Sequence, residues 1–183
     1  MKTLIINGSP RKSGDTADLL AELKRGLQGE VLEISAYYDG ISPCVDCRAC
    51  RTVRGCAIQD GMQAIYADDF ENVVIASPIY ISNLTGPLVS LAGRFQAYYS
   101  AARFLKNPFH PKRKKAALIL VGGGDGMPEG AFGLAGWMFR KMNACGFEDH
   151  TVLSLHTDEI SAREDAAALQ MVREIAGYFN ENA

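Results

Sequence analysis

The sequence predicts one α/β domain built on a parallel sheet that helices cover on both faces. Short apolar runs alternate with segments of helical periodicity along the chain of 183 residues. Two of these runs, 73–76 and 116–121, are apolar throughout, which is typical of strands buried on both faces. No internal repeat and no linker rich in serine or proline divides the sequence. We therefore expect a single doubly wound domain over residues 1–183.

The predicted elements begin with strands and helices in alternation. Strands are expected at 3–7, 31–34, 73–76, 116–121 and 151–155. A helix is expected at 16–27, because Leu20, Leu23 and Leu27 recur there at helical spacing. A shorter helix is expected at 60–68, just before the third strand. This order favours parallel strands joined by crossover helices.

Two further helices are expected in the second half of the chain. The helix beginning near Leu84 has more apolar surface than one core-facing stripe requires. Its apolar residues are Leu88, Leu91, Phe95, Tyr98 and Tyr99. Such a helix is either buried in the domain or part of an interface between subunits. The last helix is expected to begin at Ser161, because Ser161 and Glu164 have the spacing of a capping box. Its apolar stripe contains Leu169, Val172, Ala176 and Phe179.

The composition excludes several classes of protein. A formal net charge of −2 argues against a general binder of nucleic acid or of membrane surfaces. No apolar run approaches the ~18 residues that a transmembrane helix needs. The apolar stretch Leu4–Ile6 is too short for a signal-peptide core, and five cysteines are too few for a secreted disulfide scaffold. We expect a cytoplasmic protein with neither nucleic acid nor membrane as partner.

The loop after the first strand carries residues suited to a phosphate. It reads Gly-Ser-Pro-Arg-Lys-Ser-Gly-Asp-Thr from Gly8 to Thr16 and leads directly into a helix. Glycines let the backbone approach an anion, and a helix start offers unpaired N–H groups. The loop is neither a Walker A sequence nor a dinucleotide fingerprint. The residues expected to hold a monophosphate are Ser9, Arg11, Ser13, Gly14 and Thr16; a plain capped turn is the alternative.

Two further loops follow buried strands and suit a flat aromatic ligand. The first offers apolar and aromatic faces together with backbone donors. It contains Pro78, Ile79, Tyr80, Ile81, Ser82 and Asn83. The second begins with Gly122, Gly123 and Gly124. Because ligands of such sheets bind beyond the carboxyl ends of the strands, these loops and the phosphate loop are expected to form one site. Ordinary connecting turns are the alternative.

Four of the five cysteines lie within 13 positions of one another. Cys44, Cys47, Cys50 and Cys56 have the spacing C-x2-C-x2-C-x5-C. Two C-x2-C steps that share their middle cysteine are typical of iron–sulfur ligation, whereas structural zinc sites separate two ligand pairs by a longer stretch. An iron–sulfur cluster, a zinc ion and metal-free thiols all remain open. Cys145 stands apart and is expected to be a buried cysteine on a helix.

These motifs resemble those of the flavodoxin-like NAD(P)H-dependent FMN reductase family. Gly-Ser-Pro-Arg-Lys-x-Gly-x-Thr from Gly8 is similar to the FMN phosphate loop of that family, which commonly has asparagine where this chain has Asp15. Ser-Pro-x-Tyr from Ser77, followed by Gly93-Arg94, is similar to its flavin ring loop. The resemblance implies a three-layer flavodoxin-like sandwich with five parallel strands in the order 2-1-3-4-5. It also implies FMN, held by the phosphate loop, the residues 78–83 and the glycines 122–124.

The cysteine segment resembles that of the iron–sulfur flavoproteins, a branch of the same family. Those proteins carry FMN and a [4Fe–4S] cluster, and their cysteines lie between the second and third strands. Here the insertion spans about 43–58, in the corresponding place. Downstream, Ile58-Gln59-Asp60-Gly61-Met62 is similar to the family's Ile-x-Asp-Asp-Met, with Gly61 as a departure. The resemblance implies that the four cysteines of the motif bind the cluster.

Two functions follow from the resemblance. The first is an oxidoreductase that passes electrons from NAD(P)H through FMN to a flavin, a quinone or another small acceptor. The second is an electron-transfer protein in which FMN, a [4Fe–4S] cluster and a ferredoxin-like partner exchange electrons. In both, the flavin carries the chemistry and no side chain is expected to be catalytic. We expect NAD(P)H and a small electron acceptor as partners, and a homodimer or a homotetramer as the assembly.

Overall fold

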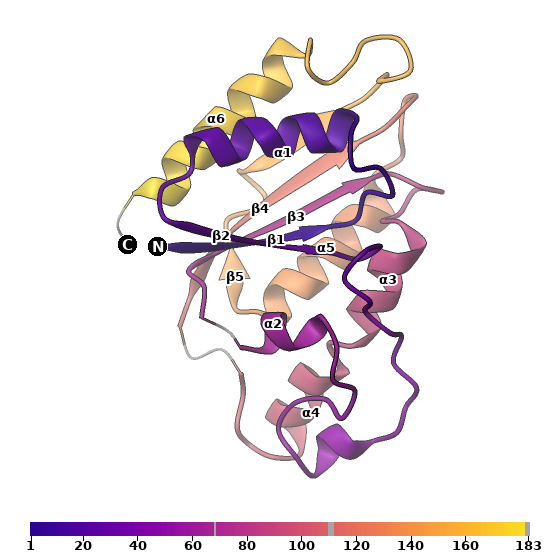
Figure 1. Ribbon diagram of the computed structural model, residues 1–183, viewed down its shortest axis with the longest axis vertical. Helices are drawn as coiled ribbons and strands as arrows, with labels where there is room; N and C mark the ends of the chain where they lie inside the picture. The colour runs from indigo at the N-terminus through magenta and orange to yellow at the C-terminus, as the bar shows by residue number, and fades with distance from the viewer. Residues whose placement is uncertain (68, 110–111, 182–183) are drawn as a thin grey trace.

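The computed structural model describes residues 1–67, 69–109 and 112–181, and in them a sheet lies between two layers of helices (Figure 1). The strands are β1 (Lys2–Asn7), β2 (Glu30–Ser35), β3 (Asn72–Pro78), β4 (Lys114–Val121), β5 (Ala144–Cys145) and β6 (Thr151–Ser154). The helices are α1 (Asp15–Gly26), α2 (Met62–Tyr66), α3 (Gly86–Gly93), α4 (Gln96–Arg103), α5 (Glu129–Lys141) and α6 (Ala166–Asn180), with a 3-10 turn, η1, at Ala49–Arg51. Residue 68, at the end of the helix expected at 60–68, lies outside the described residues.

The sheet confirms the predicted strand order. Its neighbours run β2-β1-β3-β4-β5, and the paired strands of the described residues are all parallel. The expected number of five strands was one too few, because β5 and β6 both pair with β4 along the same edge. β5 lies beside the start of β4 and β6 beside its end. A strand of two residues is too short to give a hydrophobic pattern in the sequence.

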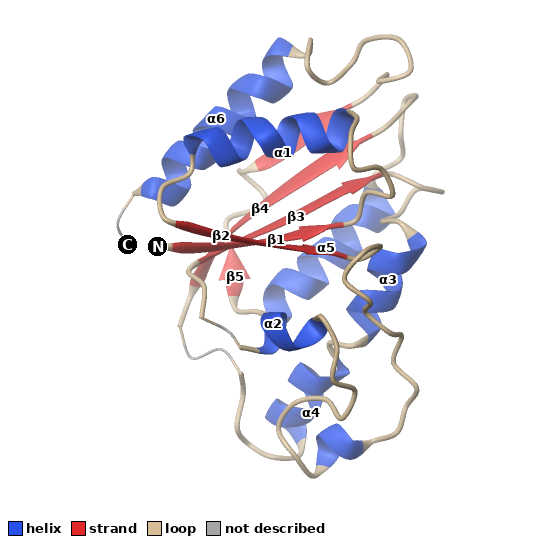
Figure 2. Ribbon diagram, viewed as in Figure 1, coloured by secondary structure: helices blue, strands red, loops and turns tan. Residues whose placement is uncertain are grey.

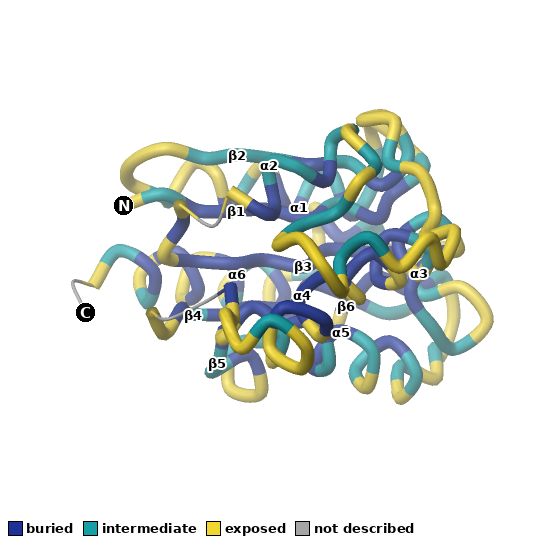
Figure 3. Tube along the Cα trace, turned by 90° about the horizontal axis from the view of Figure 1, so that it is seen from below, coloured by how far each residue is buried: buried dark blue, intermediate teal, exposed yellow. Residues whose placement is uncertain are grey.

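Each face of the sheet has its own apolar core. The side chains of β1 alternate between the two: Leu4 and Ile6 pack with the residues of α2 to α5, whereas Ile5 packs with those of α1 and α6. Figure 2 shows the two helical layers on opposite sides of the strands. The central strands are dark blue along their length in Figure 3, which marks buried residues. Burial on both faces explains why β3 and β4 are apolar runs rather than alternating ones.

The helix expected to begin near Leu84 is two helices. α3 ends at Gly93, α4 begins at Gln96, and the chain turns between them at Arg94 and Phe95. Leu88, Leu91, Phe95 and Tyr98 are buried in the core of the chain itself, whereas Tyr99 is exposed. The apolar surface of this segment is therefore explained by burial within the domain.

Two expectations about the second half of the chain were wrong. The last helix begins at Ala166 rather than Ser161, because the Asp165 carboxylate caps it by accepting a hydrogen bond from Ala168 N at 3.0 Å. Cys145 lies in β5 and is partly exposed, not buried on a helix. The helix before it, α5, went unpredicted because its glycines and alanines blur the apolar stripe. No helix in the described ranges is long and apolar enough to span a membrane.

Candidate functional site

Four loops meet at the carboxyl edge of the sheet, and hydrogen bonds join them. The Thr85 hydroxyl, before α3, donates to the Gly8 carbonyl in the loop after β1 at 2.8 Å. Ile79 N, in the loop after β3, donates to the Val121 carbonyl at 2.8 Å. Thr157 N, after β6, donates to the carbonyl of Gly122 at 3.0 Å. The three loops predicted to come together do so, and the loop after β6 joins them.

Sequence reasoning missed Thr85 and the loop after β6. Thr85 is fully buried, and besides its bond to Gly8 its backbone N–H donates to the Ser77 hydroxyl at 3.4 Å. The parallel topology itself is the signal for the loop after β6, since every parallel strand ends at the same edge. Thr85 has the weaker signal of a threonine placed just before Gly-Pro at a helix start.

The phosphate loop is held by its own backbone and hydroxyl groups. Ser9 N donates to Asn7 Oδ1 at 2.8 Å, and the Ser9 hydroxyl donates to the Arg11 carbonyl at 3.1 Å. Ser9 and Thr16 are buried, whereas Arg11 and Ser13 are exposed. Gly14 precedes α1 with a φ of 125°, a conformation that side chains disfavour, and no side chain there caps the helix. The first-turn N–H groups of α1 are thus left to an outside acceptor.

A cleft of about 650 Å³ opens beside this loop, between α1 and the edge strand β2. Its lining residues include Ser9, Arg11, Lys12, Lys24 and Tyr38. The Lys12 ammonium lies 4.9 Å from the centre of the Tyr38 ring. The loop therefore presents positive charge toward open space, as an anion site requires.

Asp15, at the start of α1, points away from the phosphate loop. Its carboxylate accepts hydrogen bonds from the Ser161 hydroxyl and from Ala162 N, both at 3.0 Å. Burial works to raise the pKa of Asp15, but these two hydrogen bonds hold it below its ordinary value. Asp15 thus links α1 to the segment before α6. Its carboxylate does not point toward the position expected for the phosphate.

Asp15→Asn is expected to bind FMN at least as tightly as the parent. An asparagine keeps the oxygen that accepts from Ser161 and Ala162, and it removes a negative charge near the bound phosphate. Fluorescence titration with FMN measures the dissociation constant of both proteins. A clearly weaker variant would contradict the orientation of Asp15.

Residues 78–83, the last residue of β3 and the loop after it, are called the ring loop and end in a strained turn. Tyr80 and Asn83 exchange two backbone hydrogen bonds of 2.8 and 3.0 Å, which places Ile81 and Ser82 at the tip. Both tip residues have positive φ, 51° for Ile81 and 58° for Ser82. Isoleucine is β-branched and strongly disfavours this conformation, and its side chain is 99% exposed. Residues in such unfavourable backbone conformations are found more often at active sites and ligand-binding segments than elsewhere.

The double variant Ile81→Asn, Ser82→Gly is expected to stabilise the flavin-free protein by about 1 kcal/mol. Asparagine followed by glycine is the preferred pair for a turn with two positive φ values. Thermal unfolding of parent and variant measures the change. An unchanged or lower melting temperature would show that the turn is not strained in solution.

The loop after β4, which begins with Gly122, Gly123 and Gly124 and is called the glycine loop, packs against the loop after β6. A side chain on Gly123 would come within 2.5 Å of the Asp158 carboxylate, so this position has no room for one. Gly124, by contrast, faces open space. Beyond it, His156 Nε2 lies 3.3 Å from a carboxylate oxygen of Asp125. Of the three glycines, Gly124 is therefore the one whose surface is free to meet a ligand.

The cysteine segment leaves the carboxyl end of β2 and runs along α3 to the far end of the molecule, where η1 packs against α4 (Figure 1). The four cysteines line one small pocket. They are Cys44 and Cys47, which are exposed, and Cys50 and Cys56, which are partly buried. The Cys50 thiol donates to the Ser100 hydroxyl at 3.2 Å, and Cys44 lies beside Gly93. The four predicted cysteines thus line one pocket, away from the loops that follow β1, β3 and β4 (Figure 1).

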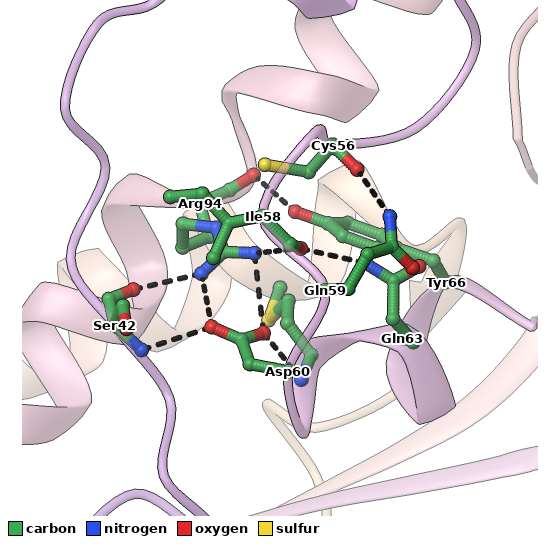
Figure 4. Close-up of polar contacts among 9 residues, drawn as sticks. Ser42, Cys56, Ile58, Gln59, Asp60, Gln63, Tyr66 and Arg94 are labelled. Atoms are coloured by element: carbon green, nitrogen blue, oxygen red, sulfur yellow. Dashed lines mark hydrogen bonds and ion pairs between the residues drawn. The ribbon is translucent and has the colours of Figure 1, made fainter.

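Arg94 joins the cysteine segment to the turn between α3 and α4 (Figure 4). Its guanidinium is fully buried and forms an ion pair with Asp60 at 2.7 Å. It also donates to the carbonyls of Ser42, at 2.8 Å, and Ile58, at 3.1 Å. Burial works to lower the pKa of Arg94, but the hydrogen bond to Asp60 and the nearby Cys56 raise it. Arg94 is therefore a permanent buried cation beside the cysteines.

The residues present fit an iron–sulfur cluster. In the described residues no three cysteine, histidine or carboxylate side chains are grouped as the ligands of one metal ion. A [4Fe–4S] cluster binds each thiolate to a different iron, so its ligands surround a volume rather than a point. The pocket shared by the four cysteines has that arrangement. In addition, Arg94 lines this pocket, and its Nε is buried without a hydrogen-bond partner among the described residues. Sulfide or thiolate is an acceptor that such a donor could use.

The chain matches known proteins over most of its length. A model of the NADPH-dependent FMN reductase family matches residues 1–153. An iron-sulfur flavoprotein of Archaeoglobus fulgidus is 28% identical over 151 residues, which cover 80% of this chain and 64% of that protein. An iron-sulfur flavoprotein of Methanocaldococcus jannaschii is 30% identical over 128 residues, 67% of this chain and 62% of that protein. The chain thus spans less than two thirds of the length of these relatives.

The fold is shared with a solved structure of low sequence identity. The NAD(P)H:quinone oxidoreductase from Methanothermobacter marburgensis aligns with a TM-score of 0.69 at 12% identity, over 100% of this chain and 98% of that one. That likeness concerns the fold alone, whereas the family model reads the sequence itself from the phosphate loop to β6. Because the family model matches residues 1–153, the chain belongs to the NADPH-dependent FMN reductase family.

Proposed function

We propose that the protein binds FMN at the carboxyl edge of its sheet and transfers electrons from NAD(P)H to a small acceptor such as a flavin or a quinone. The observation that carries the proposal is the meeting of the phosphate loop, the ring loop and the glycine loop through direct hydrogen bonds. Family membership supports the choice of FMN and of a nicotinamide as the reductant.

The phosphate loop would bind the FMN phosphate. The unpaired N–H groups at the start of α1 and the hydroxyl groups of Ser13 and Thr16 supply hydrogen bonds. The Ser9 hydroxyl, which donates to the Arg11 carbonyl, holds the loop in shape. Arg11 supplies positive charge from the exposed side of the loop. Because the Asp15 carboxylate accepts hydrogen bonds from Ser161 and Ala162, it is turned away from the phosphate, which weakens the repulsion between the two charges.

The ring loop would orient the flavin ring. Ile79 and Tyr80 offer apolar and aromatic surface. The turn tip presents the backbone N–H groups of Ile81 and Ser82, since the N–H groups of Tyr80 and Asn83 each donate to the other residue's carbonyl. Such donors fix the polar edge of a flat ligand while apolar groups exclude water from its faces. The bound flavin supplies the hydride and electron chemistry, which none of these side chains provides.

Anaerobic reduction tests this function. The protein loaded with FMN is mixed with NADPH or NADH, and the flavin absorbance is followed before a quinone or free flavin is added. We expect rapid bleaching by at least one nicotinamide and recovery of the absorbance on addition of the acceptor. Bleaching that is equally slow with both nicotinamides would contradict a reductase and leave a flavin-binding module.

A second function is supported by the cysteine pocket. We infer that Cys44, Cys47, Cys50 and Cys56 bind a [4Fe–4S] cluster, so that the protein passes electrons between FMN, the cluster and a ferredoxin-like protein. Two exposed cationic side chains of the cysteine segment, Arg48 and Arg51, line the pocket. Further cations lie outside it, Arg54 on the same segment and Arg103 at the end of α4. A cationic rim favours an acidic electron carrier over a neutral small molecule.

Iron and sulfide analysis after anaerobic reconstitution tests the cluster. We expect about four iron and four sulfide per chain in the parent. Cys50→Ser should lower both contents, because Cys50 is one of the four pocket thiols. Cys145→Ser is the matched control, since Cys145 lies in β5 and should leave both contents unchanged. A parent that takes up no iron and sulfide would contradict the second function and leave the first standing.

A further inference from the structure

The Arg94 side chain lines the cysteine pocket and has one hydrogen-bond donor, Nε–H, without an acceptor among the described residues. The two terminal nitrogens of the guanidinium are fully engaged: one donates to the Ser42 carbonyl and to Asp60, the other to the Ile58 carbonyl and to Asp60 (Figure 4). The remaining nitrogen, Nε, is buried and has no hydrogen-bond partner in the part of the chain that the structure describes. A buried donor without an acceptor is costly and rare in native proteins.

Arg94 lies between the two ends of the cysteine segment. Ser42 stands two residues before Cys44, and Ile58 stands two residues after Cys56. One guanidinium therefore holds both ends of the loop that carries the four cysteines. Arg94 also lines the pocket that the cysteines share, so the loop closes around a cavity that includes this cation.

The charge of Arg94 is already balanced, which isolates the role of Nε. Asp60 pairs with the guanidinium through both carboxylate oxygens, at 2.7 and 3.2 Å. The pair as a whole is close to neutral toward its surroundings. What remains without a partner among the described residues is the Nε–H dipole of a residue that lines the pocket. A sulfur atom that carries negative charge is a suitable acceptor for it.

We propose that Arg94 is a positioning residue of the four-cysteine site and that its Nε–H donates to a sulfur atom of the cluster bound there. The inference rests on the cluster of the proposed function. A hydrogen bond to cluster sulfur stabilises the reduced, more negative state over the oxidised one, and hydrogen bonds to the sulfurs are among the factors that set cluster potentials. Arg94 thereby raises the reduction potential of the cluster as well as closing the loop.

The test compares three reconstituted proteins by their cluster content and midpoint potential. Arg94→Lys keeps the positive charge and the partnership with Asp60 but removes Nε–H. Tyr66→Phe is the matched control, because the Tyr66 hydroxyl donates to the Arg94 backbone carbonyl at 2.7 Å and its loss loosens the same turn without touching the guanidinium. Potentiometric titration of the cluster signal, measured by electron paramagnetic resonance, gives the potential independently of turnover.

We expect Arg94→Lys to lower the midpoint potential by about 59 mV, a tenfold change in the equilibrium of a one-electron couple. Tyr66→Phe should keep the potential of the parent. Equal potentials in the parent and Arg94→Lys would overturn the inference while the cluster stands. A parent that binds no iron and sulfide would overturn the cluster and this inference together.

If Arg94→Lys assembles no cluster, a second variant, Asp60→Asn, is used. Its midpoint potential distinguishes an arginine that donates to the cluster from one that only stabilises the loop. This variant keeps the whole guanidinium and removes the carboxylate that balances it. A hydrogen bond from a now uncompensated cation should raise the midpoint potential above that of the parent. A potential equal to that of the parent would overturn the inference.

Discussion

Replacing Asp60 with alanine is expected to lower the free energy of unfolding by about 3–5 kcal/mol. The reason is the partner that the substitution leaves behind. Arg94 is fully buried and cannot lose its charge at any accessible pH. In the parent its positive charge is matched by the Asp60 carboxylate at 2.7 Å. In the variant the cation stays buried with only carbonyl groups around it.

Chemical denaturation of the flavin-free protein measures this loss. Asp60→Asn should cost less than Asp60→Ala, because the amide oxygen still accepts from Arg94. Asp69→Ala is the matched surface control: Asp69 pairs with Lys2 at 2.8 Å but its side chain is 56% exposed, so its removal should change stability little. If Asp60→Ala and Asp69→Ala had equal small effects, the Arg94 pair would be solvent-accessible in solution.

The same ion pair gives the parent an acid dependence. Burial works to raise the pKa of Asp60, but hydrogen bonds from Arg94, Ser42 N and Met62 N hold it below its ordinary value of 3.8. A carboxyl whose pKa is lower in the folded state contributes its full stability above the unfolded pKa. That contribution is lost as the pH falls below about 4 and through the folded pKa. Asp60→Ala should therefore lose less stability than the parent over this acid range.

Much of the fold followed from the sequence because strands buried on both faces leave an unmistakable pattern. The runs 73–76 and 116–121 became β3 and β4, and their ends located two of the loops of the candidate site. The start of α6 was missed because of a long-range contact: Ser161 has the spacing of a cap, but its hydroxyl donates to Asp15 instead. Which acceptor a serine finds depends on contacts 146 residues apart, and a local pattern holds no information about them.

For the cysteine segment, the sequence predicts the ligand residues but not the residue that holds them in place. The spacing of its cysteines indicated a shared ligand, and the structure gathers them around one pocket. The residue that holds the loop in place, Arg94, lies outside that spacing by dozens of positions. Its Gly-Arg sequence was noted as part of the ring-loop resemblance, yet its side chain turns to Ser42, Ile58 and Asp60. A single arginine forms no periodic pattern in the sequence. Its three partners can therefore be identified only from the structure.

Thr16→Ala is expected to weaken FMN binding by about 1.5–3 kcal/mol, the usual worth of a hydrogen bond to a charged group. In dissociation constants this is roughly a 10- to 150-fold increase. Thr16 is 4% exposed in the first turn of α1. It stands two residues after Gly14, whose φ is positive, and beside the N–H groups of that turn that no side chain caps. A phosphate bound at this helix start would meet the Thr16 hydroxyl as well as the backbone.

Alanine is a better helix former than threonine, so the flavin-free variant should not be less stable through helix propensity. A loss of FMN affinity then reports on the phosphate contact rather than on folding. Thr151→Ala is the matched control, because its hydroxyl donates to the Phe147 carbonyl at the start of β6, at the opposite edge of the sheet. Fluorescence titration with FMN should separate the two variants. Equal affinities would place the phosphate away from α1, and with it the whole orientation of the flavin across the ring and glycine loops.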